Sequence, residues 1–79
     1  MQKRFLKPLC ERRARIIFES VVEEMGCPTR PEEISELRER CYKRLYGYNP
    51  VEVEIMKEKI DELVTEYKSR LRDYMISYV

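Results

Sequence analysis

Apolar residues recur every three or four positions in three segments of the chain, which is the spacing of an amphipathic helix. Pro8 suits the first turn of the first helix, and Gly26 followed by Pro28 supplies its end. The segment is therefore predicted to be helical over about residues 8–25, with Leu9 and Ile16 outside the apolar face. That face consists of Cys10, Ala14, Ile17, Phe18, Val21, Val22 and Met25.

The second segment opens on Thr29 and Glu32, the pattern of a capping box, in which each side chain accepts a hydrogen bond from the other residue's backbone amide. Gly47 supplies the end, so a helix is predicted over about residues 30–46. Its apolar face consists of Ile34, Leu37, Cys41, Leu45 and Tyr48.

In the third segment, Asn49, Pro50 and Glu52 form a helix start: a cap, a proline at the first position and an acid at the third. No helix breaker follows, so a helix is predicted over about residues 50–77. Short connections make successive helices antiparallel neighbours. We therefore expect one all-α domain over residues 1–79, an up-down-up bundle of three helices. The apolar face of the third helix starts with Val53, Met56, Ile60, Leu63 and Val64.

The third helix is longer than the second and would extend about 11 residues past it, or about 16 Å at 1.5 Å per residue. Its apolar residues there have coiled-coil spacing and would lack a partner within the chain, which marks an interaction site. The alternatives are that residues 1–7 fold back over this end or that it frays. We predict a homodimer whose interface consists of Ile60, Val64, Tyr67, Leu71, Tyr74, Met75 and Tyr78.

The cysteines, Cys10, Cys27 and Cys41, are too widely spaced for a zinc site, and histidine is absent, so no metal or cofactor is expected. Antiparallel pairing would bring Cys10 near Cys41, and two buried thiols are favoured over a disulfide. No leader and no apolar run of membrane length is present, which predicts a cytoplasmic protein that does not bind membranes. Thirteen Glu and ten Arg beside one Asn and one Gln are typical of thermophile proteins, although many helical proteins share this composition.

Positive charge is concentrated near the start of the chain, although the net charge is only +1. Residues 1–15 carry six basic side chains and one acidic one, whereas the rest of the chain carries ten basic and fourteen acidic ones. The simpler interpretation is a solvated face compensated by the acidic start of the third helix. The alternative is a pole that binds anions.

Basic and aromatic residues alternate over residues 38–48, a pattern that can hold phosphates while stacking on bases. The structural alternative is that Tyr42 and Tyr46 are half-buried at the rim of the core. DNA or RNA would be bound by eleven residues: Lys3, Arg4, Lys7, Arg12, Arg13, Arg15, Arg40, Tyr42, Lys43, Arg44 and Tyr46.

Two other functions fit the sequence less well. A helix-turn-helix would place Glu32, Glu33 and Glu36 in the major groove, where phosphates repel them. An enzyme would need a general base, and the chain has no histidine and no carboxylate in an apolar context. The sequence predicts a small dimeric regulatory protein of transcription that binds nucleic acid without catalysis. The alternative is a protein–protein adaptor that uses the Tyr/Met-rich third helix and has no nucleic-acid role.

Overall fold

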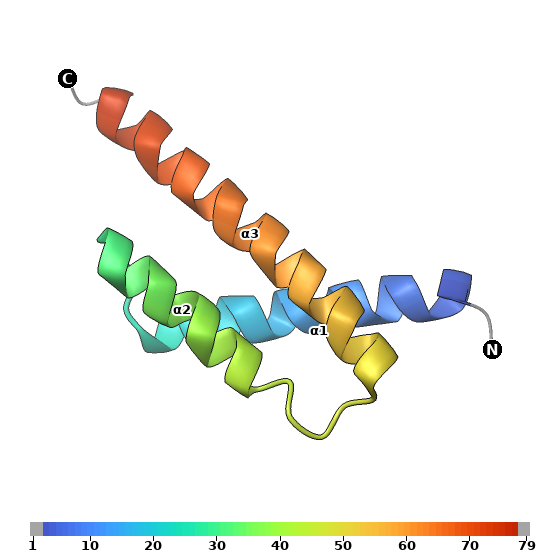
Figure 1. The fold of residues 1–79 in the computed structure, drawn as a ribbon. Coiled ribbons are helices and arrows are strands. Elements are labelled where there is room, and N and C mark those ends of the chain that lie inside the picture. Colours follow the sequence, from blue (N-terminus) through green and yellow to red (C-terminus); the bar gives the residue numbers. More distant parts are fainter. Residues whose placement is uncertain (1–2, 78–79) are drawn as a thin grey trace.

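Three helices make up the part of the chain that the computed structural model describes, namely the backbone of residues 3–77 and the side chains of residues 6–72. They are α1 (Lys3–Glu24), α2 (Pro31–Lys43) and α3 (Pro50–Ser77) (Figure 1). No strand occurs within residues 3–77, so the all-α prediction is confirmed. None of these helices combines the length and the apolar character needed to cross a membrane.

The start of α1 differs from the prediction based on Pro8. The helix begins at Lys3, so the proline lies inside it. Pro8 has no backbone N–H, and the carbonyl oxygen of Arg4 therefore lacks its usual donor four residues on. The loss of this one hydrogen bond is tolerable because Pro8 lies close to the helix start. The first four amides of any helix have no intrahelical acceptor, so few helical hydrogen bonds precede the proline.

The end of α1 is a left-handed turn at Gly26, as predicted. The φ angles are +71° at Gly26 and +56° at Cys27. The amide of Gly26 donates to the carbonyl oxygen of Glu23 at 3.1 Å, and that of Cys27 donates to the carbonyl oxygen of Val22 at 2.9 Å. This is the Schellman pattern, which satisfies carbonyl groups that a helix end otherwise leaves unpaired.

The cap of α2 lies one residue later than predicted. The carboxylate of Glu33 accepts hydrogen bonds from the backbone amides of Arg30 at 3.2 Å and Thr29 at 3.4 Å. The predicted box between Thr29 and Glu32 was therefore wrong in register. Because α2 begins at Pro31, its third position is Glu33.

The start of α3 is as predicted. The side-chain Oδ1 of Asn49 accepts a hydrogen bond from the amide of Val51 at 2.9 Å. The carboxylate of Glu52 accepts one from the amide of Asn49 at 3.3 Å. Both bonds provide acceptors for backbone amides at the helix start. The negative charge of the Glu52 carboxylate also interacts favourably with the positive end of the helix dipole.

One hydrophobic core joins the three helices, and no polar or charged side chain is buried among the described residues. Leu9 and Ile16 lie outside it, 52% and 57% exposed, as their positions in the helical pattern predict. The buried residues come from the predicted apolar faces: Cys10, Ala14, Phe18, Val21, Ile34, Leu37, Cys41, Leu45, Met56, Ile60, Leu63 and Val64.

α3 has its most extensive contact with α1 and continues past it (Figure 1). The ring of Tyr67 meets that of Phe18 edge to face, with centroids 6.0 Å apart. The Tyr67 hydroxyl also donates to the carbonyl oxygen of Pro28 in the loop before α2, at 2.5 Å. Leu71 is the last α3 residue with a described side chain that packs against the core, and the backbone of α3 continues from there to Ser77.

These contacts correct the predicted dimer surface. Ile60 and Val64 are 0% and 2% exposed, so they belong to the core of the single chain and not to a surface that a second chain could meet. Tyr67 and Leu71 are half-buried and pack against the same core. The prediction compared α3 with α2 alone and overlooked the cover that α1 supplies. Tyr74, Met75 and Tyr78 lie outside the described side chains.

Cys10 and Cys41 are both 0% exposed, and both thiols are free. They pack as small hydrophobic residues, the alternative that the sequence favoured over a disulfide. Burial raises the pKa of the Cys41 thiol from its ordinary 9.0 to about 11. The pKa of Cys10 is raised as well, by burial and then by the charge of Glu52.

Candidate nucleic-acid interface

The connection between α2 and α3 is a tight turn, and it begins three residues earlier than the predicted end of α2. The helix stops at Lys43, and the amides of Arg44 and Leu45 donate to carbonyl oxygens only three residues back, at 3.1 and 3.0 Å. Such bonds tighten the last turn of a helix. Gly47 follows with a φ of +94°, a conformation in which any side chain would be strained. Tyr46 therefore lies on a turn and not on the face of a helix.

A hollow of about 360 Å³ opens beside this turn, and we call it the turn hollow. Two lysines and three tyrosines contribute to its wall, together with apolar residues. None of the described residues that line it is a carboxylate. The lining consists of Tyr42, Lys43, Leu45, Tyr46, Gly47, Tyr48, Pro50, Val53 and Lys57.

The three tyrosines of the turn hollow differ in exposure. Tyr46 is 86% exposed and Tyr48 is 37% exposed, whereas Tyr42 is half-buried. The Tyr42 hydroxyl donates a hydrogen bond to Asp61 of α3. Burial raises the pKa of Tyr42, and this hydrogen bond raises it further. The prediction of a half-buried tyrosine at the rim of the core therefore holds for Tyr42 but was wrong for Tyr46, because α2 ends before Tyr46 is reached.

Cations lie against two of these rings. The Lys57 Nζ is 5.2 Å from the centroid of Tyr42, and the Arg13 guanidinium carbon is 5.8 Å from that of Tyr48. Both distances are within the range of cation–π attraction. Arg13 also lies 3.7 Å from the carboxylate of Glu52, the pairing between α1 and the acidic start of α3 that the charge pattern suggested. This ion pair brings the basic part of α1 next to the turn hollow.

Besides Arg13, two of the predicted arginines pair with carboxylates. Arg40 pairs with Glu36 one turn earlier in α2, at 2.7 Å. Arg44 pairs with Glu24, the last residue of α1. The sequence placed Arg44 beside the basic start of α1, but Glu24 lies about 16 Å along the helix from Arg13 at 1.5 Å per residue. Arg44 therefore belongs to the other end of α1.

The remaining predicted residues are spread along α1 and the turn. Arg12 and Arg15 are exposed on α1, and Lys43 is exposed at the end of α2. The side chains of Lys3 and Arg4 lie outside the described residues. Lys7 lines a different hollow, which is acidic.

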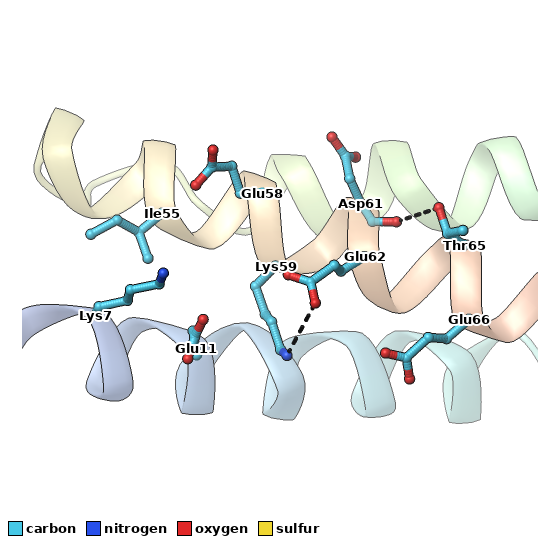
Figure 2. Close-up of a pocket in the computed structure, with 9 residues that line it drawn as sticks. All are labelled: Lys7, Glu11, Ile55, Glu58, Lys59, Asp61, Glu62, Thr65 and Glu66. Carbon is cyan, nitrogen blue, oxygen red and sulfur yellow. Dashed lines mark hydrogen bonds and ion pairs between the residues drawn. The ribbon is translucent and has the colours of Figure 1, made fainter.

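This second hollow, of about 590 Å³, lies between α1 and α3, and we call it the acidic groove (Figure 2). Five residues with carboxylates and two lysines contribute to its lining, a formal net charge of −3, although the Asp61 carboxylate points away from α1 (Figure 2) and accepts the hydrogen bond from Tyr42. One lysine, Lys59, is also 3.9 Å from the carboxylate of Glu62. The carboxylates belong to Glu11, Glu58, Asp61, Glu62 and Glu66.

Of the lysines and tyrosines that line the turn hollow, two were not among the predicted ligands. Tyr48 was assigned to the apolar face of the second helix, and Lys57 was not considered. A usable signal existed for Lys57, because antiparallel helices joined near residue 49 bring it opposite Tyr42. No group of three or more Cys, Asp or Glu side chains able to hold a metal ion occurs among the described residues.

Comparison of the chain with models of protein families, with curated proteins and with solved structures found no match. The functional argument therefore depends on the geometry of the chain itself.

Proposed function

We propose that this protein binds nucleic acid without catalysing a reaction, that the turn hollow is its main contact site, and that it has a regulatory role. The observation that carries the proposal is the lining of the turn hollow, where lysines and tyrosines converge without a carboxylate. Lysines attract phosphates, and tyrosine rings offer stacking surfaces for bases. The acidic groove would repel the same ligand, so the charge distribution favours approach at the turn.

The basic residues of α1 extend this contact site. Arg13 joins them to the turn hollow through its position over Tyr48. Arg12 and Arg15 are exposed on the same helix and can reach phosphates beyond the turn. We assign Arg13, Arg40 and Arg44 smaller contributions than Arg12 and Arg15, because each of the three already pairs with a carboxylate.

A binding role without catalysis agrees with the chemistry of the described side chains. The two buried thiols, Cys10 and Cys41, have raised pKa values and stay protonated near neutral pH, which makes them poor nucleophiles. The chain contains no histidine to act as a general base.

Fluorescence anisotropy with a labelled oligonucleotide tests the proposal. Replacing Lys43 and Lys57 with Ala should weaken binding and lower the slope of log affinity against log salt by about 1 for each lysine. Lys59→Ala is the matched control, because Lys59 belongs to the same helix as Lys57 but lines the acidic groove. Affinity that does not change with salt, or equal effects of the three substitutions, would contradict the proposal.

We also propose that the scaffold is an up-down-up bundle that forms a homodimer through the end of α3. Three contacts support the arrangement: Tyr42 with Asp61, Tyr67 with Pro28, and Arg13 with Glu52. The first is the pairing of antiparallel neighbours α2 and α3, the second brings the second half of α3 to the loop before α2, and the third agrees with α1 and α3 running in the same direction. The length of α3 past Tyr67 supports a contact with a second chain.

A stop codon after Arg72 tests the dimer, because it keeps Tyr67 and Leu71, which pack against the core. The truncated chain should sediment as a monomer and keep the circular dichroism of a folded helical protein. A full-length chain that sediments as a monomer at all concentrations would refute self-association. A truncated chain that remains dimeric would place the interface elsewhere.

A further inference from the structure

Among residues 6–72, whose side chains are described, the most exposed aromatic ring belongs to the turn hollow. Tyr46 is 86% exposed, and it stands on a turn whose next residue, Gly47, has no side chain. A Cβ built on Gly47 would meet no heavy atom within 4 Å apart from those of its chain neighbours, so no other segment covers the turn at this point. A flat group can therefore approach Tyr46 without displacing a neighbour.

The size and charge of the hollow restrict what that group can belong to. A volume of about 360 Å³ is at the lower end of the range for small-ligand pockets, which is about 300–1,000 Å³. The outer surface of a duplex is convex and cannot enter such a hollow, and its bases stack on each other instead of on protein rings. A single strand can insert one base and leave its phosphates near Lys43 and Lys57.

Two other faces of the described structure do not favour a duplex. The exposed face near the start of α2 borders a hollow of about 620 Å³ lined by Glu32, Glu36 and Glu39, with Arg38 as its only cation among the described residues. The acidic groove carries a net charge of −3. A duplex laid across either face would bring its phosphates against carboxylates.

From these observations we propose that the turn hollow binds a single-stranded segment, with one unpaired base stacked on Tyr46 and the flanking phosphates held by Lys43 and Lys57. The inference rests on the proposed function and specifies its ligand. DNA and RNA single strands share this chemistry, since both present unpaired bases and phosphates.

Binding by three probes of about 15 nucleotides tests the inference: oligodeoxythymidine, oligouridine and a DNA duplex of mixed sequence. Tyr46→Ala should weaken binding of the single strands by about 5- to 150-fold, the effect expected from losing one stacked base, and leave duplex binding unchanged. Tyr46→Phe should keep the affinity, because the ring remains. If Tyr46→Ala weakens the binding of oligouridine more than that of oligodeoxythymidine, the natural ligand is RNA. The reverse result would identify it as DNA.

A second readout does not depend on a fluorescent label. The chain has six tyrosines and no tryptophan, so its intrinsic fluorescence comes from tyrosine alone. Stacking on Tyr46 should quench part of this emission when a single strand binds, and Tyr46→Ala should abolish that part.

The outcomes separate the inference from the function on which it rests. If Tyr46→Ala has no effect, or weakens single strands and duplex equally, the stacking inference is wrong, while lysine-dependent and salt-dependent binding would still support nucleic-acid binding. If none of the three probes binds at low salt, both proposals are overturned.

Discussion

The hydroxyl of Tyr67, in the second half of α3, donates a 2.5 Å hydrogen bond to the carbonyl oxygen of Pro28, in the loop between α1 and α2. This bond connects α3 to a loop that lies 39 residues earlier in the sequence. It also places the polar end of Tyr67 on a backbone group that would otherwise lack a donor, while the ring packs against Phe18.

Tyr67→Phe should therefore destabilise the protein by about 1–3 kcal/mol, the cost of leaving a partly buried carbonyl unsatisfied. The ring contact with Phe18 is retained in this variant, so the loss reports the hydrogen bond. Urea denaturation followed by circular dichroism measures it. Tyr46→Phe removes an exposed hydroxyl and should change the free energy of unfolding by less than about 0.5 kcal/mol. Equal effects at the two positions would contradict the assigned contact.

The buried thiol of Cys41 predicts a loss of stability at alkaline pH. Its pKa is about 11 in the folded chain, against an ordinary value of 9.0 when exposed. Below pH 9 the thiol is protonated in both states and its full contribution is present. As pH rises from 9 to 11, the unfolded chain releases the proton first, so the free energy of unfolding falls.

Over that window the fall from this group should reach about 2–3 kcal/mol, because each pKa unit of difference corresponds to about 1.4 kcal/mol. Urea denaturation of the wild-type protein and of Cys41→Val at several pH values measures it. The variant should lose less stability as the pH rises, although the raised pKa values of Tyr42 and Tyr67 leave some decline in both proteins. The control is Cys27→Ser, which alters an exposed thiol; because the charge of Cys27 helps to raise the pKa of Tyr67, its profile should change slightly, but less than that of Cys41→Val.

The start of α3 could be predicted from sequence because it carries a single strong signal. Asn49, Pro50 and Glu52 have no competing arrangement nearby. At the start of α2, Thr29 and Arg30 are followed by two adjacent acids, Glu32 and Glu33. A shift of one residue preserves the capping chemistry, so the local pattern does not distinguish the two registers.

The candidate site was harder to predict than the core. The spacing of apolar residues identifies which helix faces are buried, but it does not give the angle at which the helices cross. The contact between Arg44 and Glu24 depends on that angle. Tyr46 is exposed because α2 ends in a tightened turn, in which backbone hydrogen bonds join residues that are three apart in the sequence. The position of Lys57 beside Tyr42 follows from the pairing of α2 with α3 across the turn, so it could have been predicted from the antiparallel connection alone.

The cap of α2 supplies a third prediction, which tests the register directly. Glu33→Ala should cost about 0.5–2 kcal/mol, because the carboxylate accepts from two backbone amides that have no other acceptor within the helix. Glu32→Ala removes the same charge from the same turn and therefore controls for the helix dipole, which contributes about 0.3–1 kcal/mol. Thermal or urea denaturation should show the larger loss at Glu33. A larger loss at Glu32 would restore the register expected from sequence.

The ion pair between Arg44 and Glu24 supplies a fourth prediction, about the competition between folding contacts and nucleic-acid binding. Both side chains are partly exposed, so the pair should contribute only about 0.2–1 kcal/mol to stability. Because Glu24 neutralises Arg44, Arg44→Ala should weaken oligonucleotide binding less than Lys43→Ala does, although the two residues are adjacent. Glu24→Gln should release the guanidinium and strengthen binding at low salt. In the Glu24→Gln background, Arg44→Ala should then cost as much affinity as Lys43→Ala. Anisotropy titrations of the three single variants and the double variant measure this coupling, and strictly additive effects would show that the ion pair does not limit Arg44.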